Sequence, residues 1–195
     1  MSWRKPTQLR PVVVTGLLLL SAACIAIGVW TDRPARAAAR DTQDDLLEYA
    51  SPLEVLLSPD GARLYVLCQQ SGEVRVLDAA SYAVIKNIEV GKTPRGFALS
   101  VDGKRLFVTN SWDDTLSVID TGTLEVTDTW PVGAEPSSVV EDRAGKHLFV
   151  ANRISNDVAV LDAETGAEEK RLLGGRGVSY LTLSPDGARI YATHV

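Results

Sequence analysis

The stretch SVDGKRLFVTNSWDDTLSVID, residues 100–120, decides the fold, because its landmarks return every 42 residues along the chain. The apolar triplet at 106–108 has counterparts at 64–66, 148–150 and 190–192. The same interval separates the turn glycines, which are Gly61, Gly103, Gly145 and Gly187. It also separates the residues that close an apolar run, which are Asp78, Asp120 and Asp162. A repeat of this length indicates an array of units that pack against their neighbours.

Each unit is predicted to hold four short strands. In the second unit these are residues 94–100, 105–109, a strand ending at 120, and 125–132. Consecutive apolar residues in the second strand indicate burial on both faces, and the polar fourth strand indicates an outer edge. Four strands in roughly 40–45 residues are typical of a β-propeller blade. The sequence therefore predicts an all-β chain with blades at 52–93, 94–135 and 136–177, and a partial blade at 178–195.

The recurrent aspartates have a structural explanation. Three of them follow a serine in a turn that glycine closes, and three end the third strand, where a carboxylate can accept hydrogen bonds from the next backbone amides. They are Asp60, Asp102 and Asp186 in the first set and Asp78, Asp120 and Asp162 in the second. Because a residue needed in every blade serves the blade, these carboxylates are not expected to be catalytic.

About three and a half blades are fewer than the roughly four to eight that close a propeller. We therefore expect the chain to be the front part of a longer protein. Residues 38–51 are expected to be a linker, and within it Leu46–Tyr49 align with the end of the first blade. That segment is interpreted as an outer strand that closes the ring.

The N-terminal segment predicts export. Basic residues precede an apolar run at 12–30, and the Ala35–Ala37 stretch fits a cleavage site, so residues 1–37 read as a secretion signal. An uncleaved membrane anchor at 12–30 is the alternative. The remainder holds 15 Lys/Arg and 24 Asp/Glu, which argues against a nucleic-acid partner. A periplasmic or extracellular location is expected.

The segments Leu106–Asn110 and Leu148–Asn152, each followed by an apolar strand that ends in aspartate, resemble the YVTN repeat of bacterial and archaeal propellers, a family that includes surface-layer proteins. The resemblance covers residues 52–195 and implies an exported propeller, usually seven-bladed and mostly without enzymatic activity. Related propellers occur in quinoprotein dehydrogenases and lactonases, and some family members are joined to haem domains. The sequence departs from the motif asparagine at Cys68 and His194.

Candidate ligand-binding residues lie on the loops between blades and after the second strands. This placement gives Lys92, Arg95, Asn110, Trp112, Asn152, Arg153, Arg176 and His194. A mixed basic and aromatic rim suits a protein partner or a small acidic or sugar-like ligand. The run at 174–177, GGRG, is either an anion-binding nest or a plain turn.

The sequence contains none of the usual catalytic or cofactor motifs. It has no haem-attachment C-x-x-C-H, paired C-x-x-C, P-loop, G-x-S-x-G or H-E-x-x-H, so neither a cofactor nor a catalytic residue is expected. Cys68 and His194 lie three blades apart, too far to share a metal with bonds of about 2.0–2.3 Å. The leading hypothesis is a non-catalytic binding or scaffold module. The alternatives are the propeller part of a redox enzyme with haem or quinone elsewhere, and a lactonase-like hydrolase.

Overall fold

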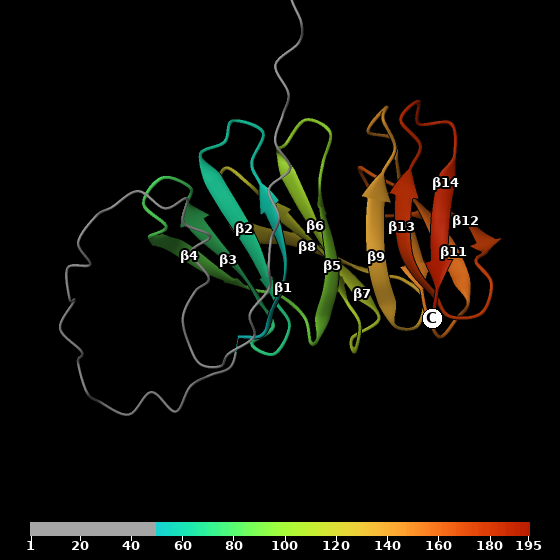
Figure 1. Ribbon diagram of the computed structural model, residues 1–195. Coiled ribbons are helices and arrows are strands. Elements are labelled where there is room, and N and C mark those ends of the chain that lie inside the picture. Colours follow the sequence, from blue (N-terminus) through green and yellow to red (C-terminus); the bar gives the residue numbers. More distant parts are fainter. Residues whose placement is uncertain (1–49) are drawn as a thin grey trace, which may run out of the picture. The chain divides into compact units, whose positions relative to one another are not determined.

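The computed structural model describes residues 50–195, whose strands form four antiparallel sheets that follow the order of the chain (Figure 1). Blade 1 consists of β1 (Pro52–Leu57), β2 (Arg63–Cys68), β3 (Glu73–Asp78) and β4 (Val84–Glu89). Blade 2 consists of β5 (Pro94–Leu99), β6 (Arg105–Asn110), β7 (Thr115–Asp120) and β8 (Glu125–Pro131). Blade 3 consists of β9 (Pro136–Glu141), β10 (His147–Asn152), β11 (Asp157–Asp162) and β12 (Glu168–Leu173). The last sheet pairs β13 (Val178–Leu183) with β14 (Ile190–His194).

These sheets confirm the predicted all-β propeller architecture, and in blade 2 the strand ends lie within a residue of the predicted ones. The predicted secretion signal or anchor and the proposed ring-closing strand, Leu46–Tyr49, lie outside the described residues. Within the described part of the chain, no helix has the length and apolar character needed to cross a membrane.

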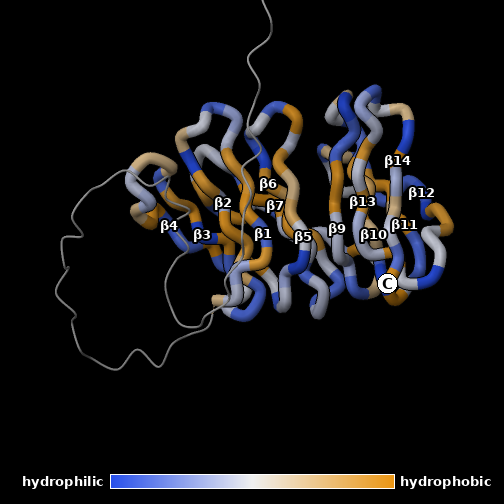
Figure 2. Tube along the Cα trace, in the orientation of Figure 1, coloured by the Kyte–Doolittle hydropathy of each residue, from blue (hydrophilic) through white to orange (hydrophobic). Residues whose placement is uncertain are grey.

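The strands differ in burial as the sequence pattern predicted. The second strand β6 is buried along nearly its whole length, because the neighbouring blades cover both of its faces. The outer strands β8 and β12 are almost entirely exposed. The apolar clusters lie between blades: one joins blades 1 and 2 around Tyr65 and Phe97, and the next joins blades 2 and 3 around Phe107. In Figure 2 the strands are mostly hydrophobic and the turns between them are mostly hydrophilic.

The turn between the first and second strands is closed by side chains. In blade 2, the Ser100 hydroxyl donates to Asp102 at 2.7 Å, and that carboxylate accepts from the Lys104 amide at 3.0 Å. These hydrogen bonds hold the pKa of Asp102 below its usual range, and the bond from Ser100 has the largest effect. Gly103 closes the turn with φ of +72°, a conformation that favours glycine. The aspartates therefore have the structural role expected of them.

Arginines at the start of the second strands tie each blade to the next. Arg63 Nη1 donates to the Thr121 carbonyl at 2.6 Å, and Arg105 Nη1 donates to the Ala163 carbonyl at 2.5 Å. The first strands also approach one another closely, since a Cβ at Gly96 would lie 2.6 Å from the Ser137 carbonyl oxygen. These contacts tie blade 1 to blade 2 and blade 2 to blade 3, and they hold the innermost strands β5 and β9 close together.

Candidate functional site

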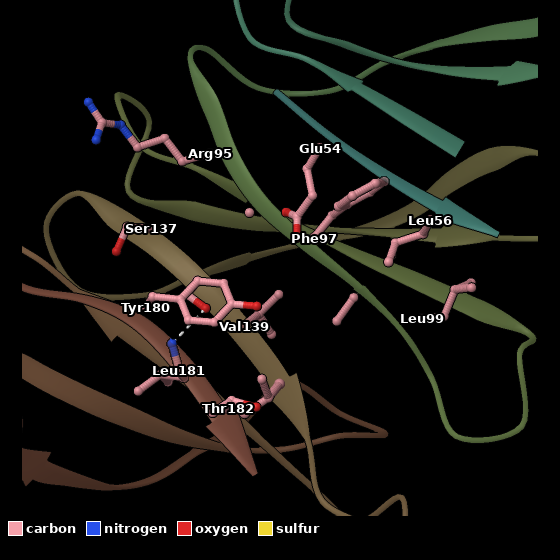
Figure 3. Close-up of a pocket in the computed structure, with 14 residues that line it drawn as sticks. Glu54, Leu56, Arg95, Phe97, Leu99, Ser137, Val139, Tyr180, Leu181 and Thr182 are labelled. Carbon is pink, nitrogen blue, oxygen red and sulfur yellow. Dashed lines mark hydrogen bonds between the residues drawn. The ribbon is translucent and has the colours of Figure 1, made fainter. Parts of the chain in front are cut away.

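The innermost strands line a groove on the concave face of the propeller, with two cavities. The first has a volume of about 360 Å³ and is lined by residues of β1, β5, β9 and β13, as Figure 3 shows. The second, about 450 Å³, lies toward the ends of β5, β9 and β13. Both cavities share Ala98, Leu99, Val140 and Thr182, so they form one continuous groove. Volumes of this order are typical of small-molecule sites.

Arg95 marks one end of this groove. It lies near the start of β5 and lines the first cavity, and in Figure 3 it projects at the opposite end from Leu99 and Thr182. Its Nε is buried without a hydrogen-bond partner among the described residues. Arg95 forms no ion pair in the described chain, in contrast to Arg153, which pairs with Glu135, and Arg171, which pairs with Glu168 and Asp157. Arg95 is therefore a cationic group at a cavity mouth that no described carboxylate neutralises.

Further polar side chains line the first cavity, namely Glu54, Tyr180, Thr182 and two serines. Burial raises the pKa of Glu54, while a hydrogen bond from the Phe97 backbone acts in the opposite direction. Tyr180 is 54% exposed, and its ring lies over the cavity beside Val139 (Figure 3). The serines are engaged within the fold, since the Ser138 hydroxyl accepts from the Leu181 amide at 3.1 Å. The cavity therefore offers a cation, a phenol and a half-buried carboxyl group.

The other end of the groove carries a buried carboxylate. The side chain of Glu141 is only 2% exposed; its Oε2 accepts from the Val101 amide at 2.5 Å, and its Oε1 lies 3.7 Å from Arg105 Nη2. That Oε1 accepts no hydrogen bond within the described chain. Burial raises the pKa of Glu141 against the lowering effects of Val101 and Arg105. Arg143 lines the same cavity and faces Asp186.

The structure brings the loops that were predicted to form the binding face together, but it buries two of the candidate residues. The Asn110 amide donates to Thr115 and Ser117, and its oxygen accepts from the Gly91 amide at 3.0 Å. Asn152 occupies the same position in blade 3 and is also fully buried. Asn110 fastens the end of the second strand to the loop before its blade, whereas the Asn152 amide donates to Asp157 of the next strand at 2.7 Å. Ligand contact by either asparagine stays a prediction.

The remaining candidates lie on the exposed loop face, apart from the cavities. Lys92 and Arg153 each pair with an acid of an adjoining loop, namely Asp113 at 3.8 Å and Glu135. Trp112 is 71% exposed at a loop tip. Among the predicted ligand-binding residues, only Arg95 lines either cavity.

The glycine-rich run at 174–177 is held as a turn. Asn156 accepts from the Gly174 amide through its carbonyl and from the Gly177 amide through its side chain, at 3.0 and 2.8 Å. These two amides are therefore not available to an anion. Arg176 is exposed on this turn. His194 Nε2 lies 2.5 Å from the Gly174 carbonyl, so the imidazole replaces the motif asparagine as a contact to the preceding loop.

His147 is partly exposed and lies beside acids of its own blade. Its Nδ1 lies 2.6 Å from Asp142 Oδ2, and its Nε2 lies 3.5 Å from Glu169 Oε2. This arrangement is confined to blade 3. Among residues 50–195, no three His, Cys, Asp or Glu side chains are placed to hold a metal ion.

The sequence interpretation missed Glu54, Tyr180 and Glu141, although the repeat contains a signal for them. Aligned by 42 residues, Glu54 and Tyr180 occupy one position, which holds Gly96 and Ser138 in the other two blades. The position of Glu141 holds leucine in the other three blades. A side chain that the blade itself requires recurs in every blade. Departures along the innermost strands therefore indicate residues that serve the groove.

Four-stranded blades around a concave groove with charged ends define this protein as a β-propeller with a ligand-sized cavity on its concave face. Residues 41–146, more than half of the chain, match the cytochrome D1 heme domain. The chain therefore belongs to the cytochrome D1 heme domain family. Propellers of this family have eight blades, whereas the resemblance to the YVTN repeat implies seven. Both that resemblance and its blade number stay predictions.

Solved structures share the fold. Kuenenia stuttgartiensis hydrazine synthase aligns with a TM-score of 0.72 and 25% identity over 80% of this chain and 46% of that one. A putative 6-phosphogluconolactonase from Bacteroides uniformis aligns with a TM-score of 0.64 and 16% identity, over 72% of this chain and 46% of that one. A second putative 6-phosphogluconolactonase, from Bacteroides fragilis, aligns with a TM-score of 0.62 and 21% identity, over 69% of this chain and 42% of that one. The chain thus spans less than half of each of these proteins. A search of curated proteins found no match.

The family raises the question of whether the described residues fit a haem. Haem iron is held by histidine, cysteine, methionine or tyrosine. Neither histidine of the described chain lines the cavities, and Tyr180 is the only lining residue of these four types. Figure 3 shows no basic side chain beside its hydroxyl, since Arg95 points away. The described residues therefore do not by themselves fit haem iron, although Arg95 suits a carboxylate.

Proposed function

We propose that this chain is the binding part of an exported, non-catalytic propeller whose concave groove takes a small organic anion. The observation that carries the proposal is Arg95, a guanidinium at the mouth of a 360 Å³ cavity without an acidic partner among the described residues. Guanidinium groups bind carboxylates through paired, charge-assisted hydrogen bonds. In the other blades the equivalent residue is uncharged, so the blade does not need this charge.

The surroundings of Arg95 suit an anion with an apolar portion. Phe97, Leu99 and Val139 supply apolar lining, and the raised pKa of Glu54 reduces the repulsion that an ionised carboxylate would exert. Tyr180 adds a hydroxyl group. A carboxylate on a short aliphatic or aromatic body matches this lining better than inorganic phosphate does.

The test is a titration of the whole chain with hexanoate and with inorganic phosphate, followed by NMR. Hexanoate is expected to shift the signals of the cavity residues, and Arg95→Ser, which installs the residue of blades 3 and 4, is expected to weaken binding by about tenfold or more. Arg189→Ser is the matched control, because it removes the same charge from an exposed position that lines neither cavity. Equal binding by both variants would refute the role of Arg95.

The second candidate is the propeller part of a redox protein, which membership of the cytochrome D1 heme domain family favours. Since the residues that line the cavities offer only a phenol to iron, the chain alone is expected to bind no stoichiometric haem in a spectroscopic titration. Stoichiometric haem binding that Tyr180→Phe abolishes would replace the first proposal with this one. A lactonase-like activity has only the likeness in fold to support it.

A further inference from the structure

Each blade places one aromatic side chain of its second strand in the junction with the next blade. Tyr65 of β2 is 1% exposed and packs against blade 2, and Phe107 of β6 is fully buried against blade 3. Phe149 of β10 packs in the cluster that joins blade 3 to the last sheet. Tyr191 of β14 occupies the same position of the repeat and is 52% exposed. The last sheet therefore presents the aromatic group of a junction that no described blade completes.

Blade 1 presents the opposite half of such a junction. Tyr65 packs among apolar residues of blade 2 that include Phe97, Leu106 and Val108. The blade 1 flank is the corresponding surface of blade 1, which consists of Val55, Leu57, Leu64, Val66 and Tyr82. Their equivalents in blade 2 all pack against blade 1, whereas Val55, Leu57 and Tyr82 are each more than half exposed. The blade 1 flank is thus a binding surface for a blade of the same repeat.

The two exposed faces are unlike each other and complementary. Figure 1 shows blade 1 and the β13–β14 sheet at opposite ends of the array of blades. Repeat proteins usually end in units with a polar outer face, and a large exposed apolar surface marks an interaction site. One face carries the aromatic group and the other carries the residues that surround it in the earlier junctions. Each face therefore fits the other and not itself.

Two copies of this chain supply the number of blades that the ring of the family has. The described residues form four sheets, the last of them with two strands, and propellers of the cytochrome D1 heme domain family have eight blades. Four sheets with the spacing of an eight-bladed ring turn through half of a circle. A contact between unlike faces generates a ring when the successive rotations close, and two such half-circles close.

We infer that two copies of this chain associate head to tail, with the last sheet of each copy on the blade 1 flank of the other, and so close a ring around a shared channel. Tyr191 of each copy packs against Val55 and Val66 of the partner subunit, as Tyr65 packs in the first junction.

The association also completes the groove. Glu54 and Tyr180 line the first cavity from β1 and β13, its two outermost strands, and they occupy the same position of the repeat. In the ring, Tyr180 becomes the neighbour of Glu54 of the partner subunit, and each groove becomes half of the closed channel. This inference goes beyond the proposed function and does not depend on it.

Sedimentation velocity of the whole chain at several concentrations tests the inference, and the wild type is expected to form a dimer. Val55→Lys and Tyr191→Glu should each weaken dimerisation by at least about tenfold, because each places a charge in an apolar junction. Both positions are exposed in the single chain, so the variants are expected to fold. Ile154→Lys is the matched control, because it places a charge at an exposed position of the loop between β10 and β11, and it should remain dimeric.

Mixing Val55→Lys with Tyr191→Glu distinguishes a head-to-tail contact from other modes of association. The mixed dimer has one junction of unaltered faces and one in which lysine meets glutamate, so the mixture should regain the dimer that neither variant forms alone. A variant that had failed to fold would not be rescued in this way.

Several results would overturn the inference. They are a wild type that stays monomeric up to about 100 μM, a loss of the dimer in only one of the two variants, and no recovery on mixing. Assemblies that grow beyond the dimer would show that the contact does not close, and association that neither variant weakens would place it elsewhere, as in the apolar run at 12–30. Further blades in the natural protein, shown by its intact mass, would overturn the inference as well, because they would cover the blade 1 flank.

Discussion

Replacing Glu141 by leucine should raise the free energy of unfolding at neutral pH by about 1 kcal/mol. The side chain is almost completely buried, so in the folded protein its charge is removed from water. The hydrogen bond from the Val101 amide and the ion pair with Arg105 offset part of this penalty. In the variant, Val101 lies at an exposed turn where water can satisfy its amide, and Arg105 keeps its bond to the Ala163 carbonyl.

The stabilisation should depend on pH in a defined direction. Burial raises the pKa of Glu141 above its ordinary value of 4.5, so the folded state holds a proton more tightly than the unfolded state. The stability that this tighter proton binding gives to the wild type is fully present below about pH 4.5, and it is lost as the pH rises through the folded-state pKa of Glu141. The advantage of the variant should therefore be largest at neutral pH and should shrink on acidification.

Urea unfolding of both proteins at a series of pH values measures this difference, and thermal unfolding should show an increase of about 2–4 °C at neutral pH. Glu125→Leu at an exposed position should show no such pH dependence. If Glu141→Leu is less stable than the wild type at neutral pH, or if the difference does not change with pH, the contacts of Glu141 outweigh its burial and the reasoning is wrong.

Three further predictions concern the blade itself. Asn110→Ala removes the hydrogen bonds of a fully buried amide and should lower the free energy of unfolding by about 2–3 kcal/mol in urea. Gly96→Ala places a Cβ 2.6 Å from the Ser137 carbonyl oxygen and should cost about 1–3 kcal/mol, measured in the same way; an unchanged midpoint would show that β5 and β9 can separate. Hydrogen bonds lower the pKa of Asp120, and the bond from the Thr123 backbone has the largest effect. Asp120→Asn should therefore destabilise the protein at neutral pH, and the destabilisation should disappear as the pH falls below the folded-state pKa of Asp120. Urea unfolding at a series of pH values measures this change.

The fold was predictable because the repeat contains several independent signals. The interval between Gly61, Gly103 and Gly145 fixed the blade length, and the apolar run around Phe107 identified the strand that both neighbouring blades cover. Each signal is local to a strand or a turn. Such signals do not depend on how the blades are arranged, so they can be recognised in the sequence before the arrangement of the blades is known.

The site was less predictable because its geometry arises from contacts between blades. Arg95 was named for its place near a loop, yet its importance comes from the cavity that four separate strands enclose. Asn110 was named for the same reason and proved to be buried, because its amide fastens the loop to the strand. Tyr180 and Glu141 lie on innermost strands, where alternation alone does not reveal which side chains face the groove.

The arginine ties between blades have a consequence for the order in which the chain folds. Arg63 reaches Thr121 and Arg105 reaches Ala163, so each tie joins a residue to one 58 positions later. During synthesis, a blade therefore remains unfastened until the third strand of the following blade has emerged. In blade 3 the equivalent residue is His147, which bonds within its own blade, so this series of ties stops there. The junction between blade 3 and the last sheet is held instead by the hydroxyl groups of Ser137 and Ser138 and by the buried apolar cluster around Val178, so it lacks the arginine contact that the earlier junctions have.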